Sequence, residues 1–88
     1  MSPVRPWFYT YVLKCNMGTF YTGATNNLET RLGQHETGKI FYTKNRLPVR
    51  LVYFEACLVK SDAYRRERYL KTGMGKRYLK NRINPVTN

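Results

Sequence analysis

The stretch that most constrains the fold of this chain is FYTYVLKCNMGTFYTG, at residues 8–23. Its first half alternates between two kinds of side chain with a period of two, which is typical of a β-strand whose two faces differ. An asparagine and a glycine in residues 16–19 favour a chain reversal, because both tolerate left-handed backbone conformations. The stretch therefore predicts a β-hairpin, and a suitable register would set Tyr11 and Tyr21 close together on one face.

The charge of the chain points to a polyanionic partner. It carries 16 Lys and Arg residues against 5 Asp and Glu, a formal net charge of +11. Each contact to a phosphate releases condensed counterions, so nucleic acid is the expected ligand, with DNA and RNA both open. A basic protein that simply adheres to ribosomal RNA would have the same composition.

With 88 residues, the chain has room for one domain with a small core.

Neither cysteine has the spacing of a metal or redox site. Cys15 and Cys57 lie in two apolar strand patterns, so we expect buried, reduced thiols. The sequence shows no signal-peptide pattern and no apolar run long enough to cross a membrane. These features predict a cytoplasmic protein without a membrane partner, associated with the nucleoid if it binds DNA.

A helix and a basic loop are predicted to follow the hairpin. Asn26 stands three residues before Glu29, which is the spacing of a helix-capping asparagine and its acidic partner. Gly38 can end the helix, which gives bounds of about 27–37. Residues 39–48 mix aromatics with cations before a proline, and we expect a loop with one helical turn there.

The second half of the chain predicts one strand and two helices. Residues 49–57 alternate in character and are rich in apolar side chains, which predicts a third strand at the centre of the sheet. Ser61 is a suitable N-cap for a helix that runs to about Thr72, with Gly73 at its exit. Residues 75–83 predict a short basic amphipathic helix.

The first of these helices places a carboxylate on its inward stripe. Ala63, Glu67 and Leu70 recur at positions i, i+4 and i+7, so Glu67 should face the core. Two interpretations are open. Glu67 either forms an ion pair with one of the arginines around it or binds a metal ion.

Arg31 and His35 lie four residues apart and therefore share one face of the helix after the hairpin. Each has an ordinary alternative, namely a solvated or phosphate-binding arginine and a packed histidine with one satisfied nitrogen. The sequence contains no Walker glycine loop and no Cys/His cluster for zinc. Its Ser and Cys residues have no evident base partner, so a serine or cysteine hydrolase has little support.

Taken together, these residues resemble the GIY-YIG nuclease superfamily over about residues 7–83. The first motif stands here as Tyr9-Thr10-Tyr11 and the second as Tyr21-Thr22-Gly23. The family arginine, histidine and metal-binding glutamate correspond to Arg31, His35 and Glu67, the last in the run RRERYLK. The stretch from Lys71 to Arg82 is similar to the end of the small, stand-alone bacterial members.

Two positions depart from the family pattern. The first motif lacks the family's glycine and isoleucine and keeps its final tyrosine, Tyr11. Ala24 follows Gly23, where excision-repair relatives have a lysine that could lower the pKa of the tyrosine in the second motif. The basicity of Tyr21 therefore depends on other cations.

The resemblance implies an α+β fold with a three-stranded antiparallel sheet, built from the N-terminal hairpin and one further strand and flanked by three to four helices. It implies one nuclease domain at residues 7–83, an N-terminal arm at residues 1–6 and a tail at residues 84–88. The implied activity is endonucleolytic hydrolysis of DNA phosphodiester bonds by water and a divalent ion, Mg²⁺ or Mn²⁺. The cleavage would be structure-directed or belong to repair or recombination.

The resemblance also assigns roles. Glu67 would hold the ion, and Tyr21 or Tyr11 would orient or deprotonate the attacking water. Arg31 would bind the scissile phosphate and stabilise its developing charge. His35 would hydrogen-bond phosphate or assist proton transfer.

Further residues are expected to support the site or bind DNA. Gly23 would let backbone and phosphate approach closely, and Asn81 would support the site from the last helix. Contacts to the DNA backbone would come from five cations: Lys44, Arg46, Lys76, Arg77 and Lys80. We expect a monomer or weak dimer, with a protein partner for targeting. The alternative is a non-catalytic basic nucleic-acid-binding module with the same fold, and a ribosome-associated structural protein is a third option.

Overall fold

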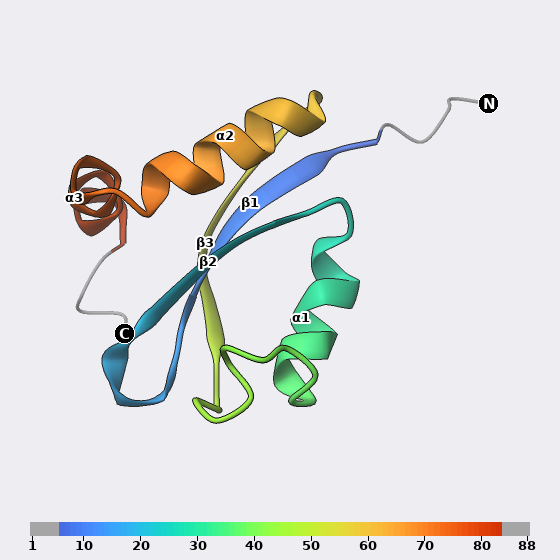
Figure 1. The fold of residues 1–88 in the computed structure, drawn as a ribbon, viewed down its shortest axis with the longest axis vertical. Coiled ribbons are helices and arrows are strands. Elements are labelled where there is room, and N and C mark those ends of the chain that lie inside the picture. The colour runs from blue at the N-terminus through green and yellow to red at the C-terminus, as the bar shows by residue number, and fades with distance from the viewer. Residues whose placement is uncertain (1–5, 84–88) are drawn as a thin grey trace.

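The structure is a computed structural model that describes residues 6–83. Three strands and three α-helices follow one another in the order ββαβαα (Figure 1). The α+β class and the three-stranded antiparallel sheet predicted from the sequence are confirmed. The tail predicted at residues 84–88 and the arm predicted at residues 1–6, apart from Pro6, lie outside the described residues.

The sheet is built around its first strand. β1 (Phe8–Lys14) pairs antiparallel with β2 (Phe20–Thr25) on one side and with β3 (Arg50–Cys57) on the other. The hairpin is therefore confirmed, but the prediction that the third strand is central was wrong, since the strand order is β2-β1-β3.

Burial explains why β1 takes the centre. Four successive β1 residues, Thr10 to Leu13, are almost completely buried, which requires cover on both faces of the strand. β3 instead alternates, and its Phe54 ring is half exposed. The apolar content of a strand does not show whether one or both of its faces are buried, and for this reason it did not identify β1 as the central strand.

The hairpin turn is a short 3₁₀ helix, Asn16–Gly18. Its left-handed residues are Met17, with φ of 67°, and Gly18, with φ of 82°, so Asn16 does not supply the left-handed position. The register pairs Leu13 with Tyr21 and Tyr11 with Gly23. Tyr21 is therefore a diagonal neighbour of Tyr11 on the same face of the sheet.

The first α-helix, α1 (Leu28–Glu36), agrees closely with the predicted range. Its cap is Asn27, whose side chain accepts a hydrogen bond from the Thr30 N–H at 3.0 Å, and not Asn26. Gly38 follows the helix with φ of 77°, as a stop signal of this kind predicts. The 39–48 segment then forms turns, one of them closed by a bond from the Lys44 N–H to the Ile40 carbonyl.

The last two helices meet at a different point from the one predicted. α2 (Lys60–Leu70) begins before Ser61, and no side chain caps it, so the predicted Ser61 cap was wrong. α3 (Gly73–Arg82) begins two residues earlier than expected, because the Thr72 hydroxyl caps it by accepting from the Gly75 N–H.

The helices cover opposite faces of the sheet (Figure 1). Thr10 of β1 donates a hydrogen bond to the Ala63 carbonyl of α2, whereas the next residue, Tyr11, contacts His35 of α1. Successive strand residues point to opposite faces, so α1 covers the Tyr11 face and α2 covers the Thr10 face. On the latter face Val12, Leu70 and Leu79 form the buried hydrophobic core.

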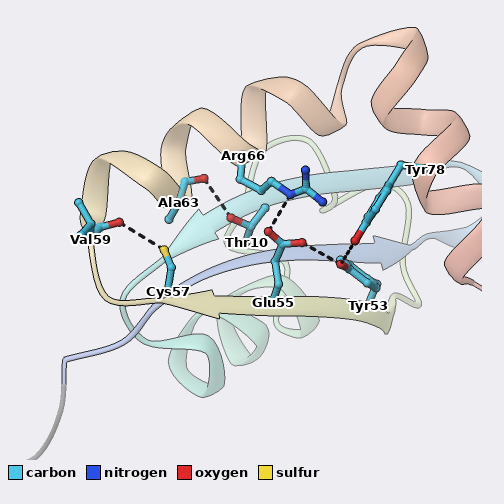
Figure 2. Close-up of polar contacts among 8 residues, drawn as sticks. All are labelled: Thr10, Tyr53, Glu55, Cys57, Val59, Ala63, Arg66 and Tyr78. Carbon is cyan, nitrogen blue, oxygen red and sulfur yellow. Dashed lines mark hydrogen bonds and ion pairs between the residues drawn. The ribbon is translucent and has the colours of Figure 1, made fainter.

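A polar cluster joins β3 to α2 and α3 (Figure 2). Arg66 of α2 donates to the Glu55 carboxylate at 2.8 Å, and the Tyr53 hydroxyl donates to the same carboxylate at 2.7 Å. The Arg66 guanidinium also lies 4.5 Å from the ring centroid of Tyr78 on α3. These contacts hold the edge strand against both helices.

Both cysteines are free thiols. Cys15 is buried as predicted, whereas Cys57 is only partly buried and donates to the Val59 carbonyl. Within residues 6–83, no helix is long and apolar enough to cross a membrane.

The junction of α2 and α3 depends on a glycine. A Cβ added to Gly75 would lie 2.5 Å from the Leu70 Cα and would collide with the Tyr69 carbonyl, both of them backbone groups that cannot move aside easily. We expect Gly75→Ala to lower the free energy of unfolding by about 1–3 kcal/mol, as overpacked sites usually do. Urea denaturation measures this change.

Gly33 provides the matched control, because it also lies in a helix and a Cβ there would meet nothing within 4 Å. Gly33→Ala should raise stability by up to about 1 kcal/mol, since alanine costs less backbone entropy. Equal losses in both variants would contradict the close helix contact at Gly75.

Candidate active site

Tyr11 lies at the centre of the site. Its side chain is completely buried, and its hydroxyl is 2.8 Å from Nε2 of His35 on α1. The two rings meet edge to face, with centroids 5.7 Å apart. The sheet thus presents the phenol of its central strand directly to the helix that covers this face.

Gly23 makes room for the Tyr11 ring. A Cβ at position 23 would lie 2.6 Å from the Tyr11 hydroxyl oxygen and 2.7 Å from the carbon that bears it. Gly23 and Tyr11 are directly paired across the hairpin, so the ring lies over the glycine backbone. In this structure the group that approaches Gly23 closely is therefore a tyrosine ring, whereas the sequence suggested a phosphate.

His35 is completely buried and bonded at both ring nitrogens. Nδ1 lies 2.7 Å from the Thr43 hydroxyl, and Nε2 is the atom that contacts Tyr11. The sequence analysis considered a packed histidine with one satisfied nitrogen, and the structure shows a packed histidine with both nitrogens satisfied. The hydrogen-bond partners of the imidazole are the hydroxyl groups of Tyr11 and Thr43.

Thr43 was missed by the sequence analysis. It is completely buried, although its neighbours in the 39–48 loop are mostly exposed. A threonine between a tyrosine and a lysine gives no local signal of burial. Only the contact with His35 identifies it.

The buried pair is held in its neutral forms. Burial raises the pKa of Tyr11 well above its ordinary value, and the neighbouring Tyr21 adds to this, while Arg31 opposes it. Burial lowers the pKa of His35 to about 4, and the positive charge of Arg31 acts in the same direction. Neutral imidazole has one donor and one acceptor nitrogen, so one of its two hydroxyl partners donates to it and the other accepts.

Tyr21 occupies the more exposed side of the aromatic group. Its ring centroid lies 4.9 Å from His35 and 6.2 Å from Tyr11, and its side chain is only partly buried. The predicted proximity of the two tyrosines is therefore observed. A third tyrosine, Tyr42 of the loop, packs against Tyr21 in a tilted arrangement, with centroids 5.4 Å apart.

Arg31 and Glu67 approach Tyr11 from α1 and α2. Both influence its pKa, Arg31 lowering it and Glu67 raising it. The Glu67 side chain is only 19% exposed, in agreement with its inward stripe. It accepts a hydrogen bond from Lys71 at 2.9 Å, so the ion pair considered from the sequence forms with a lysine and not with an arginine.

The donor set fits a magnesium-type ion bound by one carboxylate. Within residues 6–83 there is no group of three or more His, Cys, Asp or Glu side chains, which argues against an all-protein cage. Mg²⁺ commonly keeps several waters and uses one or two carboxylates together with substrate phosphate oxygens. Glu67 suits that mode, because the Lys71 partner is half exposed and a surface ion pair is weak.

A groove of about 840 Å³ runs beside Tyr21, between the hairpin and the ends of α2 and α3. Of the five predicted DNA-binding cations, Lys76 and Lys80 line it. Lys44 and Arg46 lie on the adjacent loop, where each cation stacks on an aromatic ring.

Of all the site and DNA-binding residues predicted from the sequence, only Tyr21, Lys76 and Lys80 line the groove. Arg77 and Asn81 are exposed on α3 and are not among the residues that line it. Conversely, Lys14, Phe20 and Lys71 line the groove and were not singled out from the sequence.

Three comparisons relate this chain to known proteins. A profile of the GIY-YIG catalytic domain matches residues 7–84. A UPF0213 protein of Staphylococcus haemolyticus is 47% identical over 73 residues, which cover 82% of this chain and 89% of the relative. A UPF0213 protein of Streptococcus agalactiae is 50% identical over 64 residues, or 72% of this chain and 73% of the relative.

One solved structure is also similar. The solution NMR structure of a UPF0213 protein from Bacillus halodurans superposes with a TM-score of 0.58 at 34% sequence identity. The match covers 91% of this chain and 89% of that one. The names of these relatives state a family and no activity, so the chemistry has to be argued from the site.

The neutral state of His35 can be tested by pH. His35 is the only histidine in the chain, so its ring signals in an NMR titration of the untagged protein are unambiguous. We expect a midpoint near pH 4 in the folded protein, against the ordinary value of 6.5. Because the unfolded chain takes up the proton first, stability should fall as the pH drops below 6.5, by about 2 kcal/mol between pH 7 and pH 5.

The control for this loss is His35→Gln, which cannot take up the proton. The free energy of unfolding of the variant should not contain the loss that comes from protonation of His35. The difference in this free energy between wild type and variant should therefore become smaller as the pH falls. A His35 midpoint near 6.5 in the folded protein would contradict the buried, neutral ring.

Replacing the Thr43 hydroxyl should disturb the histidine. Thr43→Val keeps the shape of the side chain but leaves Nδ1 of His35 without its 2.7 Å partner, and we expect a loss of about 1–3 kcal/mol of stability. The ¹⁵N shifts of the His35 ring should change in Thr43→Val and remain near the wild-type values in Thr43→Ser, which retains the hydroxyl. Unchanged shifts in both variants would show that the contact does not set the tautomer.

Proposed function

Because the chain belongs to the GIY-YIG family, we propose that it is an endonuclease that hydrolyses DNA phosphodiester bonds with Mg²⁺ or Mn²⁺. The observation that carries the proposal is the contact of Tyr11 with His35, together with the presence of Arg31 and Glu67 near enough to influence the pKa of Tyr11. This arrangement would combine a cation that binds phosphate, a carboxylate that binds a metal ion and phenols that contact the attacking water.

Glu67 would hold the divalent ion, which when bound supplies charge neutralisation at a phosphate oxygen. Arg31 would bind the scissile phosphate, and its guanidinium offers paired N–H donors to the oxygens on which charge develops. Lys71, now the partner of Glu67, would be released to contact the DNA backbone.

Tyr21 is the better candidate for contact with the attacking water. Tyr11 is completely buried, its hydroxyl is engaged by His35, and its pKa is raised, all of which favour a neutral phenol. Tyr21 borders the groove and is partly exposed. Tyr11 and His35 would then be positioning residues that fix the ring of Tyr21, which lies against both.

The second candidate function is a non-catalytic DNA-binding module. The observation that favours it is the Glu67–Lys71 ion pair, which gives the inward carboxylate a structural partner without any metal ion. In that case the cations alone account for DNA binding, and Glu67 contributes nothing to it.

A cleavage assay separates the two. Supercoiled, flapped and junction DNA are incubated with the wild type in Mg²⁺, Mn²⁺ or EDTA, and nicking is followed on gels. We expect metal-dependent cleavage that falls by about 100-fold or more in Glu67→Gln and in Arg31→Ala, since each removes a charge used in the transition state. The matched controls Glu36→Gln and Arg68→Ala change exposed residues and should retain activity.

The outcomes are distinct. Cleavage that survives in Glu67→Gln would refute the metal assignment. A wild type that cleaves none of these substrates with either ion, and binds them as Glu67→Gln does, would support the binding module instead.

A further inference from the structure

The groove beside Tyr21 has an apolar floor. Buried side chains of the core, Val12, Leu70 and Leu79, form part of its lining. A surface that served only to bind the phosphates of a duplex would gain nothing from such a floor, because the bases of a duplex are stacked inside the helix.

The rim of the groove is cationic. Four lysines line it, Lys14, Lys71, Lys76 and Lys80, and none of the described residues in the lining is acidic. Lys71 is paired with Glu67, while Lys76 and Lys80 are exposed on one side of α3, four residues apart. Cations at this spacing can follow a strand of phosphates along the groove.

The wall next to the hairpin is aromatic. Phe20 is 48% exposed and Tyr42 is 39% exposed, and both line the groove together with Tyr21. Exposed aromatic rings beside a basic groove are what proteins use to stack successive unpaired bases.

From this combination of floor, rim and wall we infer that the groove binds single-stranded DNA. The apolar and aromatic surfaces receive the bases and the lysines receive the phosphates. The inference deepens the proposed function, since a strand in the groove passes Tyr21, and it makes unpaired or branched DNA the preferred substrate. Binding in the groove does not itself depend on cleavage.

The test is a binding measurement in EDTA, which prevents cleavage. Fluorescence anisotropy compares a labelled single-stranded oligonucleotide with the blunt duplex of the same sequence. We expect the wild type to bind the single strand more tightly. Phe20→Ala should weaken single-strand binding about fivefold or more, the usual effect of losing one stacking ring, and leave duplex binding unchanged within error.

Phe54→Ala is a closely matched control. Phe54 is also a phenylalanine on an edge strand, it is 51% exposed, and it does not line the groove. It should leave both affinities unchanged. Lys80→Gln should weaken single-strand binding and reduce its dependence on salt, because one phosphate contact is lost.

Three results would overturn the inference: tighter binding of the duplex than of the single strand, equal effects of Phe20→Ala and Phe54→Ala, or tighter binding of the same sequence as RNA. Circular dichroism of each variant confirms that the fold is retained. The two proposals can fail independently. If the protein binds single strands through Phe20 but cleaves no DNA, the single-strand groove is supported and the nuclease is refuted. If it cleaves DNA but binds duplex more tightly, the nuclease is supported and the single-strand groove is refuted.

Discussion

The position of the Tyr11 ring is the constraint on which the rest of the site depends. Its strand is paired on both edges and buried on both faces. The phenol ring therefore lies across the hairpin, over the backbone of the paired residue Gly23. Only a glycine at position 23 leaves that space open. The hydroxyl then meets His35, which in turn requires a partner for its other nitrogen and finds Thr43. A single ring thereby fixes the hairpin, the first helix and the basic loop relative to one another.

The edge strand β2 explains how opposite faces of the sheet contribute to one site. α1 and α2 lie on different faces, yet Arg31 of α1 and Glu67 of α2 both influence the pKa of Tyr11. This is sterically feasible because, within residues 6–83, no strand pairs with the outer edge of β2, so side chains from both faces can approach around it. Gly23 lies on the same strand and leaves room there for the Tyr11 ring. β3, at the other edge, is instead held against α2 by the ion pair between Glu55 and Arg66.

Much of this arrangement could be predicted from the sequence, because it rests on local patterns. The hairpin followed from alternation and turn residues, the first helix from its cap and stop signals, and the inward position of Glu67 from its spacing with Ala63 and Leu70. The remainder depends on long-range packing. The central strand could not be identified, because apolar content does not report how many faces are covered. Thr43 and the groove arise only when segments distant in sequence meet.

The balance of charge gives the last argument about what the chain does. A carboxylate near the phosphates repels them, so in a protein of net charge +11 that only binds DNA, Glu67 would lower affinity unless Lys71 neutralised it. A divalent ion would do more than neutralise it, because it adds positive charge at the position where a phosphate oxygen would develop negative charge. Lys71 is the more exposed partner of the ion pair, so it can leave at little cost when such an ion binds. The Glu67–Lys71 ion pair is thus compatible with a nuclease, since it stabilises the Glu67 carboxylate and can be replaced by a bound ion.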